Sequence, residues 1–150
     1  MVIADIGSSN VTTVMIVEDD IDFQEVLKDV FAESPVFKII GTFSTLEQFT
    51  ESIPEDHEAA QSFLADLLIL DVMSSGKTPS WNNVDGATVA TLLRQTGLNF
   101  AVLLVSSMKS HHFELHGHRK NWEFVRKSSR LSPNEILHHA RLAIASEVVN

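Results

Sequence analysis

Short, continuous runs of apolar residues, separated by segments with helical spacing, restrict the possible folds of this chain more than any other feature. Four runs are clear and a fifth is weaker: Val11 to Val17, Leu67 to Leu70, Ala101 to Val105, Trp122 to Val125 and the weaker Val36 to Ile40. A run without polar alternation is typical of a strand that helices cover on both faces, as in a parallel sheet. We therefore predict that the five runs are the strands of one parallel sheet.

The segments between the runs carry apolar residues at the spacing of helices. The first stripe consists of Val26, Leu27, Val30 and Phe31, and the second of Val89, Leu92 and Leu93. The third, in the last helix, consists of Ile136, Leu137, Ala140, Ala143 and Ile144. Gly97 follows the second stripe, where glycine commonly ends a helix. Capping boxes at Ser44-Thr-Leu-Glu47 and Ser132-Pro-Asn-Glu135 predict two helix starts, the second with Pro133 at the first helical position.

Strand and helix alternate five times, which predicts an α/β fold. We expect a doubly wound (βα)5 domain with a five-stranded parallel sheet, right-handed crossovers and helices on both faces. The length of 150 residues suits a single domain over residues 1–150, with a core from about 11 to 148. Two connections are long, about 53–65 and 74–84, and we interpret them as insertions, the first with an extra short helix that starts at Pro54.

Composition excludes several classes of site. The chain has no cysteine, which excludes disulfides, thiolate metal sites and cysteine nucleophiles. With 20 acidic and 11 basic residues the formal net charge is −9, so direct nucleic-acid binding by this segment is not expected. No apolar run approaches the ~20 residues that span a bilayer, and the N-terminus lacks a secretory profile. We expect a cytoplasmic protein without a membrane segment.

Polar residues follow four of the predicted strands at the point where each strand ends. Glu18-Asp19-Asp20 follows the first, Asp71 the third, Ser106-Ser107 the fourth and Lys127 the fifth. In an open parallel sheet, ligands bind beyond the carboxyl ends of the strands. Carboxylates that converge there repel one another, and a bound hard divalent cation usually offsets this repulsion. Mg²⁺ suits the site because it accepts one or two carboxylates and bridges to phosphate oxygens.

The order of these strand ends resembles the receiver domain of response regulators in two-component signalling, from about Val11 to Val148. The motifs are Val-Glu18-Asp19-Asp20, Leu-Ile-Leu-Asp71-Val-Met, Val-Leu-Leu-Val-Ser106-Ser107 and Phe124-Val-Arg-Lys127. Each motif is weak by itself, but four in order at successive strand ends form a strong joint signal. The resemblance implies a flavodoxin-like sheet with strand order 2-1-3-4-5.

The resemblance also implies a role for each residue of the site. Asp71 is similar to the phosphoacceptor, and Glu18 and Asp19 to the acidic pair that holds Mg²⁺, with Asp20 as a further participant. Asp71 itself and the backbone carbonyl of Met73 are the other implied metal ligands. A carboxylate can attack a phosphoryl donor only if the negative charge of the incoming phosphoryl group is neutralised. Mg²⁺ and the lysine would neutralise that charge.

Three further residues match the part of the family that responds to phosphorylation. Ser106 matches the switch hydroxyl, Lys127 the lysine that pairs with a phosphoryl oxygen, and Phe124 the aromatic switch residue. These groups can follow the charge of a new phosphate, so the loops that carry them move and a distant surface changes.

The sequence departs from the family pattern around the site. Ser128 stands where the family has a proline after the lysine, so the peptide bond that follows Lys127 is either trans or strained. Ser75 stands at the position of a second proline that is common in the family. Met73 and Met108 flank the implied path of the hydrolytic water, and thioethers cannot act as general bases, so we expect slow dephosphorylation. Trp81, in the long loop after Asp71, either closes over the site or anchors the loop by packing.

Ordinary alternatives exist for the same residues. Asp71 could cap a turn, Asp20 could cap a helix, and Ser106 and Lys127 could be a strand-end hydroxyl and a surface charge. A second group of metal-binding residues is suggested by the histidines His111, His112, His116 and His118, but a solvated helix explains them better, and the same holds for His138 and His139.

The expected function is a switch that catalyses only its own phosphorylation and dephosphorylation. The expected partners are a sensor histidine kinase or phosphotransfer protein and a downstream protein or effector domain, with output or homodimerisation through the surface of helix 4, strand 5 and helix 5. The chain would be a stand-alone receiver or a fragment of a longer regulator.

The alternatives are a degenerate receiver that acts as an interaction module independent of phosphorylation, and a phosphohydrolase of the haloacid dehalogenase type. Phosphohydrolases of this type have a second aspartate at the position where this chain has Met73, which argues against them.

Overall fold

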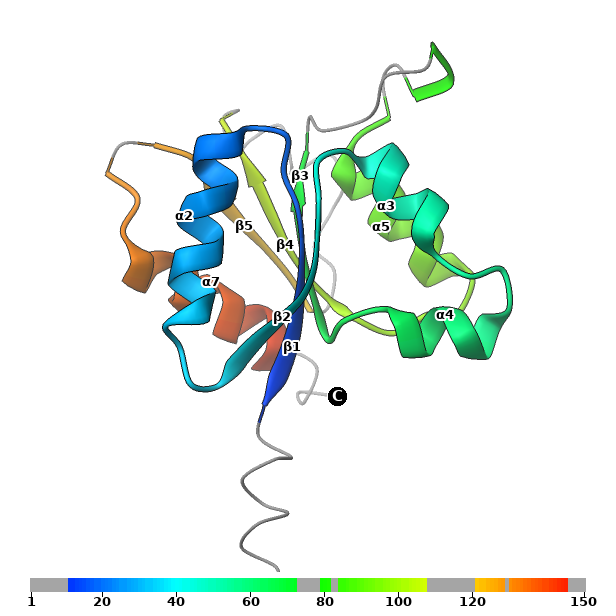
Figure 1. The fold of residues 1–150 in the computed structure, drawn as a ribbon, viewed down its shortest axis with the longest axis horizontal. Coiled ribbons are helices and arrows are strands. Elements are labelled where there is room, and N and C mark those ends of the chain that lie inside the picture. Colours follow the sequence, from blue (N-terminus) through cyan, green and yellow to red (C-terminus); the bar gives the residue numbers. More distant parts are fainter. Residues whose placement is uncertain (1–10, 73–78, 82–83, 108–120, 129, 146–150) are drawn as a thin grey trace, which may run out of the picture.

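A five-stranded, wholly parallel sheet forms the centre of the molecule (Figure 1). The structure, a computed structural model, describes residues 11–72, 79–81, 84–107, 121–128 and 130–145. The strands are β1 (Thr12–Val17), β2 (Phe37–Phe43), β3 (Leu67–Asp71), β4 (Ala101–Ser106) and β5 (Trp122–Arg126). Their order is β2-β1-β3-β4-β5, which confirms the predicted topology, and each predicted run contains the core of one strand.

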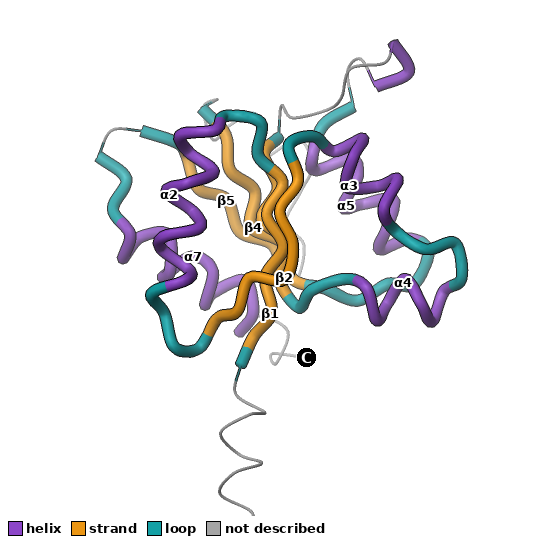
Figure 2. Tube along the Cα trace, in the orientation of Figure 1, coloured by secondary structure: helices purple, strands orange, loops and turns teal. Residues whose placement is uncertain are grey.

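Helices cover both faces of the sheet, as predicted. The helices α2 (Ile21–Ala32) and α7 (Pro133–Ala145) lie on one face, whereas α3 (Leu46–Ser52), α4 (His57–Phe63) and α5 (Gly86–Gln95) lie on the other (Figure 2). A 3-10 turn, η1 (Pro79–Trp81), belongs to the long connection between β3 and α5. Among the described residues, no helix has the length and apolar character needed to cross a membrane.

The apolar character of the strands explains the two-layered core. Every residue of β3 and β4 is buried. Because successive side chains of a strand point to opposite faces, Leu68 and Leu70 pack with the α3, α4 and α5 side, whereas Leu67 and Ile69 pack with the α2 and α7 side. Polar residues would leave unpaired groups on one face or the other, so these strands read as continuous apolar runs.

The helix ends follow local capping chemistry, with two corrections to the predicted starts. Thr45, not Ser44, caps α3: its hydroxyl accepts from Gln48 N at 3.0 Å, while Gln48 Oε1 accepts from Ser44 N at 2.8 Å. The extra helix of the 53–65 connection exists, but Asp56 caps it and it begins at His57 rather than at Pro54. An oxygen that accepts the orphan amide hydrogens of the first turn decides the start in both cases.

Two other predicted helix signals are confirmed. Ser132 Oγ accepts from Glu135 N at 3.2 Å and Glu135 Oε1 accepts from Ser132 N at 3.2 Å, which is the reciprocal capping box at the start of α7. Gly97 has a φ of 92°, a conformation that favours glycine, and follows the cap residue Thr96 at the end of α5.

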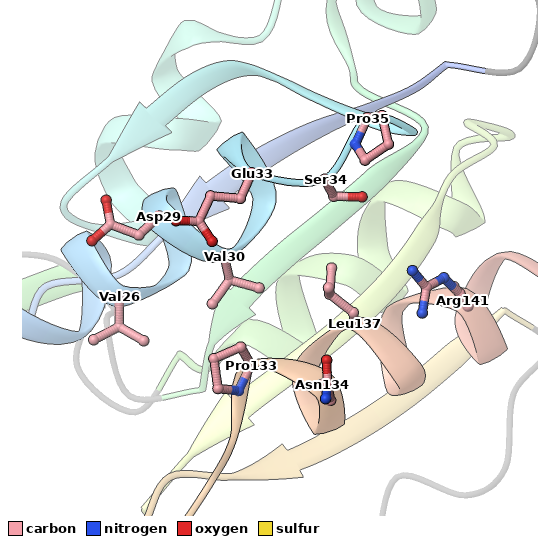
Figure 3. A pocket seen from close by; sticks show the side chains of 10 residues that line it. All are labelled: Val26, Asp29, Val30, Glu33, Ser34, Pro35, Pro133, Asn134, Leu137 and Arg141. Atoms are coloured by element: carbon pink, nitrogen blue, oxygen red, sulfur yellow. The ribbon is translucent and has the colours of Figure 1, made fainter.

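Two residues of the predicted apolar stripes are exposed, and three others are only half-buried. Val26 is 44% exposed because it lines a cavity of about 560 Å³ between α2 and α7, together with Leu137 and Pro133 (Figure 3). Leu92 is 56% exposed and lines a smaller apolar hollow beside Trp81. Helical spacing identified the correct face of each helix, but it could not tell where neighbouring elements diverge.

Arg94, near the end of α5, fixes the entry to β5. Its Nη2 donates to the carbonyl oxygens of Phe100 at 2.8 Å and of Asn121 at 3.1 Å. The guanidinium carbon also lies 5.2 Å from the ring centre of Phe100 and 5.3 Å from that of Trp122. Asn121 has a φ of 62°, so the chain turns sharply at the residue that Arg94 holds.

We expect Arg94→Met to lower the free energy of unfolding by about 2 kcal/mol, because carbonyl oxygens lose a charged donor and two rings lose a cation. Urea denaturation measures the change. Arg141→Met is the matched control, since Arg141 is exposed, and it should change stability by less than about 0.5 kcal/mol. Equal effects of the two substitutions would show that Arg94 does not hold the entry to β5.

Candidate functional site

Three carboxylates meet at the edge of the sheet formed by the carboxyl ends of β1 and β3. Glu18 and Asp19 directly follow β1, and Asp71 is the last residue of β3. These strands are neighbours in the sheet, and one oxygen from each carboxylate lies within 4.8 Å of the others. The residues that the sequence placed at successive strand ends are therefore brought together.

Lys127 completes the group from the end of β5. Its backbone N donates to Ser106 O at 2.7 Å, which ties it to the end of β4. Its Nζ donates to Glu18 Oε2 at 2.9 Å and to Asp71 Oδ2 at 3.2 Å. Burial by itself lowers the pKa of Lys127, but the hydrogen bond with Glu18 and the negative charges of Asp71 and Glu18 outweigh it and raise the pKa. The ammonium is therefore charged at neutral pH.

Glu18 is wholly buried, and its two oxygens have different surroundings. Oε2 accepts from Asp20 N at 3.0 Å and from Lys127. Oε1 lies 2.8 Å from Lys127 Nζ, but not in hydrogen-bond geometry, and so it is buried without a donor among the described residues. Burial, together with the neighbouring carboxylate of Asp71, raises the pKa of Glu18 to about 8 despite the attraction of Lys127.

Asp19 and Asp20 are adjacent but have different tasks. Asp19 is exposed at the rim of the carboxylate group, and desolvation together with the proximity of Asp71 raises its pKa. Asp20 caps α2, because its Oδ1 accepts from Asp22 N at 3.0 Å and from Phe23 N at 3.3 Å. Asp20 is not one of the three clustered carboxylates, and the helix-capping interpretation of this residue is confirmed.

The donor set fits a hard divalent cation. Three carboxylates supply oxygen ligands, and one of them has a buried oxygen without a hydrogen-bond donor. When all three are deprotonated, one ammonium against three carboxylates leaves two negative charges, which a divalent cation would neutralise. Glu18, Asp19 and Asp71 are the residues that would hold it. The implied backbone ligand Met73 lies outside the described residues.

The two predicted switch residues lie on the strands that border Lys127. Ser106 is buried at the end of β4, where its carbonyl accepts the backbone N–H of Lys127. Phe124 is half-buried on β5 and packs against the core on the α5 side. Ser106 is therefore bonded to the backbone of Lys127, and Phe124 lies on the strand that Lys127 follows. Lys127 and Ser128 are joined by a trans peptide, which answers the question that the missing proline left open.

Trp81 packs away from the carboxylates. It contacts the core on the α5 side and borders an apolar hollow together with Thr50, Val84 and Leu92. The contacts favour the interpretation that Trp81 anchors the long loop by packing. Ser75, Met108 and the histidines His111, His112, His116 and His118 lie outside the described residues.

Three residues that position the site were not predicted from the sequence. Gln24 Nε2 donates to Glu18 O at 2.9 Å and to Phe43 O at 3.3 Å, which joins the ends of β1 and β2. The ring of Phe23 lies under the Lys127 ammonium, 5.0 Å from Nζ to its centre. A Cβ at Gly86 would lie 3.0 Å from Asp71 O. The only sequence signal was their place in the first turns of helices that follow β1 and β3.

The fold is that of response regulator receiver domains. Sequence comparison finds no matching family model and no matching curated protein. Similar structures include the signal receiver domain of NarL from Mycobacterium tuberculosis, with 20% identity, a TM-score of 0.65 and coverage of 92% of this chain and 98% of that one. A LuxR-family DNA-binding response regulator from Staphylococcus aureus has 17% identity, a TM-score of 0.67 and coverage of 89% and 99%. The response regulator domain of Thermotoga maritima CheB has 22% identity, a TM-score of 0.62 and coverage of 90% and 97%. The predicted resemblance is thus confirmed for the fold.

We expect the metal-free protein to lose stability as the pH rises from about 5.5 to 8. The pKa of Glu18 is about 8 in the folded protein against 4.5 for the free side chain, so the folded state binds more protons in this range and stability falls with pH. The loss due to Glu18 should be on the order of 3 kcal/mol, measured by denaturation in EDTA. Glu18→Gln should remove this part of the pH dependence.

Added Mg²⁺ should raise the melting temperature more at pH 8 than at pH 5.5, because the ion binds carboxylates that have lost their protons. Equal pH profiles for the wild type and Glu18→Gln would contradict the raised pKa. Stabilisation by Mg²⁺ that is unchanged in Glu18→Gln would place the ion elsewhere.

We expect Gly86→Ala to displace the end of β3 and to destabilise the protein by about 1–3 kcal/mol, because the new methyl group meets the backbone of Asp71. Gly41→Ala is the control: its methyl group would lie 3.3 Å from the movable ring of Phe43. Urea denaturation and amide NMR shifts of Asp71 measure both effects. A larger effect at Gly41 would show that the contact of Gly86 with β3 does not constrain the site.

Proposed function

We propose that this chain is a phosphoacceptor receiver domain of a two-component response regulator, in which Asp71 is phosphorylated in a Mg²⁺-dependent reaction. One observation carries the proposal: Asp71 Oδ2 lies 3.2 Å from an ammonium and within a group of three carboxylates at the carboxyl edge of the sheet. The likeness of the fold to receiver domains supports it.

Each residue of the group has a part in the proposed reaction. A carboxylate oxygen of Asp71 forms a bond to phosphorus while the bond between phosphorus and the donor breaks, and the donor leaves with that bond's electron pair. Bound Mg²⁺ would neutralise charge on the transferring phosphoryl group. Lys127 already faces Asp71 and can pair with a phosphoryl oxygen without a large movement. The hydroxyl of Ser106 is the proposed donor to another phosphoryl oxygen.

The proposed output is a change of the protein-binding surface near β5. Lys127 N is hydrogen-bonded to Ser106 O, so the ends of β4 and β5 respond together when the charge at Asp71 changes. Phe124, half-buried on β5, is the proposed side chain that carries this change to the surface of β5. A downstream protein, an effector domain or a second copy of the chain would bind there.

The proposed phosphoryl donor is a sensor histidine kinase or a phosphotransfer protein, which would place the chain in the cytoplasm. The similar Staphylococcus aureus structure is that of a DNA-binding response regulator, and this supports a role upstream of an effector. The chain would catalyse only its own phosphorylation and dephosphorylation, with no separate substrate.

We expect Asp71→Asn to abolish phosphorylation by acetyl phosphate in the presence of Mg²⁺, because an amide is not a nucleophile. Acid-labile, hydroxylamine-sensitive incorporation of phosphate is the measurement, with EDTA as the metal-free comparison. Asp56→Asn is the matched control, since asparagine also caps a helix and Asp56 lies at the start of α4.

Wild-type incorporation in Asp71→Asn would remove Asp71 from its role. A wild-type protein that takes up no phosphate from acetyl phosphate or from a kinase would instead favour an interaction module that is independent of phosphorylation.

A further inference from the structure

Phe23 contacts the site, although the proposed phosphoryl chemistry assigns it no part. It lies in the first turn of α2 and is half-buried against the core on the α2 and α7 side. Lys127 Nζ lies over its ring, 5.0 Å from the ring centre. An ammonium at this distance is attracted by the electron-rich face of an aromatic ring. Phe23 is thus a third partner of the ammonium, beside Glu18 and Asp71.

The other two partners are also carboxylates of the candidate cation site. A divalent cation would draw on the same oxygens and repel the ammonium, so both ion pairs of Lys127 would weaken when the cation binds. The ring carries no charge and is no ligand for a hard cation, which binds oxygen. The attraction between Phe23 and Lys127 therefore persists when the ion pairs weaken.

The backbone of β5 cannot hold the ammonium by itself. The hydrogen bond from Lys127 N to Ser106 O fixes the backbone, but a four-carbon stem with freely rotating bonds separates it from Nζ. The side chain is 18% exposed, so a path to solvent is open. A contact near Nζ that does not use the carboxylates would keep the ammonium beside Asp71 when a cation is bound.

We propose that Phe23 is a positioning residue, whose ring face holds the Lys127 ammonium beside Asp71 when a divalent cation occupies the carboxylates. This inference rests on the proposed function, because the positioned ammonium is the group that would meet the incoming phosphoryl oxygen.

Fluorinated phenylalanines at position 23 test the electrostatic part of this role. Mono-, di- and trifluorophenylalanine keep the shape of the ring and make its face progressively less negative. At saturating Mg²⁺, the rate of Asp71 phosphorylation by acetyl phosphate should fall stepwise, by roughly threefold to thirtyfold over the series. Trifluorophenylalanine at Phe43 is the control, because that ring is half-buried too but packs edge-on against Phe49 at 5.4 Å. It should leave the rate unchanged.

A second readout does not depend on phosphorylation. The ring current of Phe23 should move the Cε proton resonances of Lys127 upfield, with Lys127→Arg identifying the signal. The shift should persist at saturating Mg²⁺, vanish in Phe23→Leu and return in Phe23→Tyr.

The two readouts separate the possible failures. A wild type that is not phosphorylated would refute the proposed function, while the resonance of Lys127 would still decide whether Phe23 holds the ammonium. Equal rates across the fluorinated series, or loss of the upfield shift when Mg²⁺ binds, would overturn the role of Phe23.

Discussion

The ammonium of Lys127 lies between two buried carboxylates, and the other features of the site depend on this interaction. Glu18 follows β1 and Asp71 ends the neighbouring strand β3, so the sheet itself prevents them from moving apart. Lys127 offsets their repulsion only in part, because burial still raises the pKa of Glu18 to about 8. Once Glu18 loses its proton, the three carboxylates exceed the one ammonium by two negative charges. A site with this imbalance favours a further cation, so we expect its stability to depend on pH and on divalent ions.

The topology explains why groups so far apart in the sequence meet. In a parallel sheet every strand ends at the same edge, and the order β2-β1-β3-β4-β5 places the ends of β1 and β3 side by side at the centre. The apolar strands are buried on both faces, and Gln24 and Gly86 pack close to their ends. The charged group is thus built on the buried centre of the sheet, which suits a site that must keep a fixed geometry.

The strand ends and their chemistry could be predicted from the sequence, whereas the contacts that position them could not. Asp71 and Lys127 stand out because polar residues at or just after the ends of four apolar runs must meet at one edge of a parallel sheet. Phe23 and Gln24 do not stand out, since an aromatic and an amide in a first helical turn have ordinary roles elsewhere. Val26 was predicted to be buried and is not, because the divergence of α2 and α7 depends on packing across the whole face. Helical spacing records only which side of a helix faces the protein.

Under the proposed function, the same ammonium would also connect the chemistry with the surface. In the resting arrangement Lys127 divides its hydrogen bonds between Glu18 and Asp71. Phosphorylation would replace the carboxylate charge of Asp71 with the larger charge of a phosphoryl group, placed further from β3, so the ammonium would move toward it. The backbone of Lys127 is bonded to Ser106, and β5 is paired along its length with β4 and with no other described strand. An edge strand with a partner on one side resists displacement less than a central strand, so the movement would reach Phe124 more readily than it would reach the core of β1 or β3.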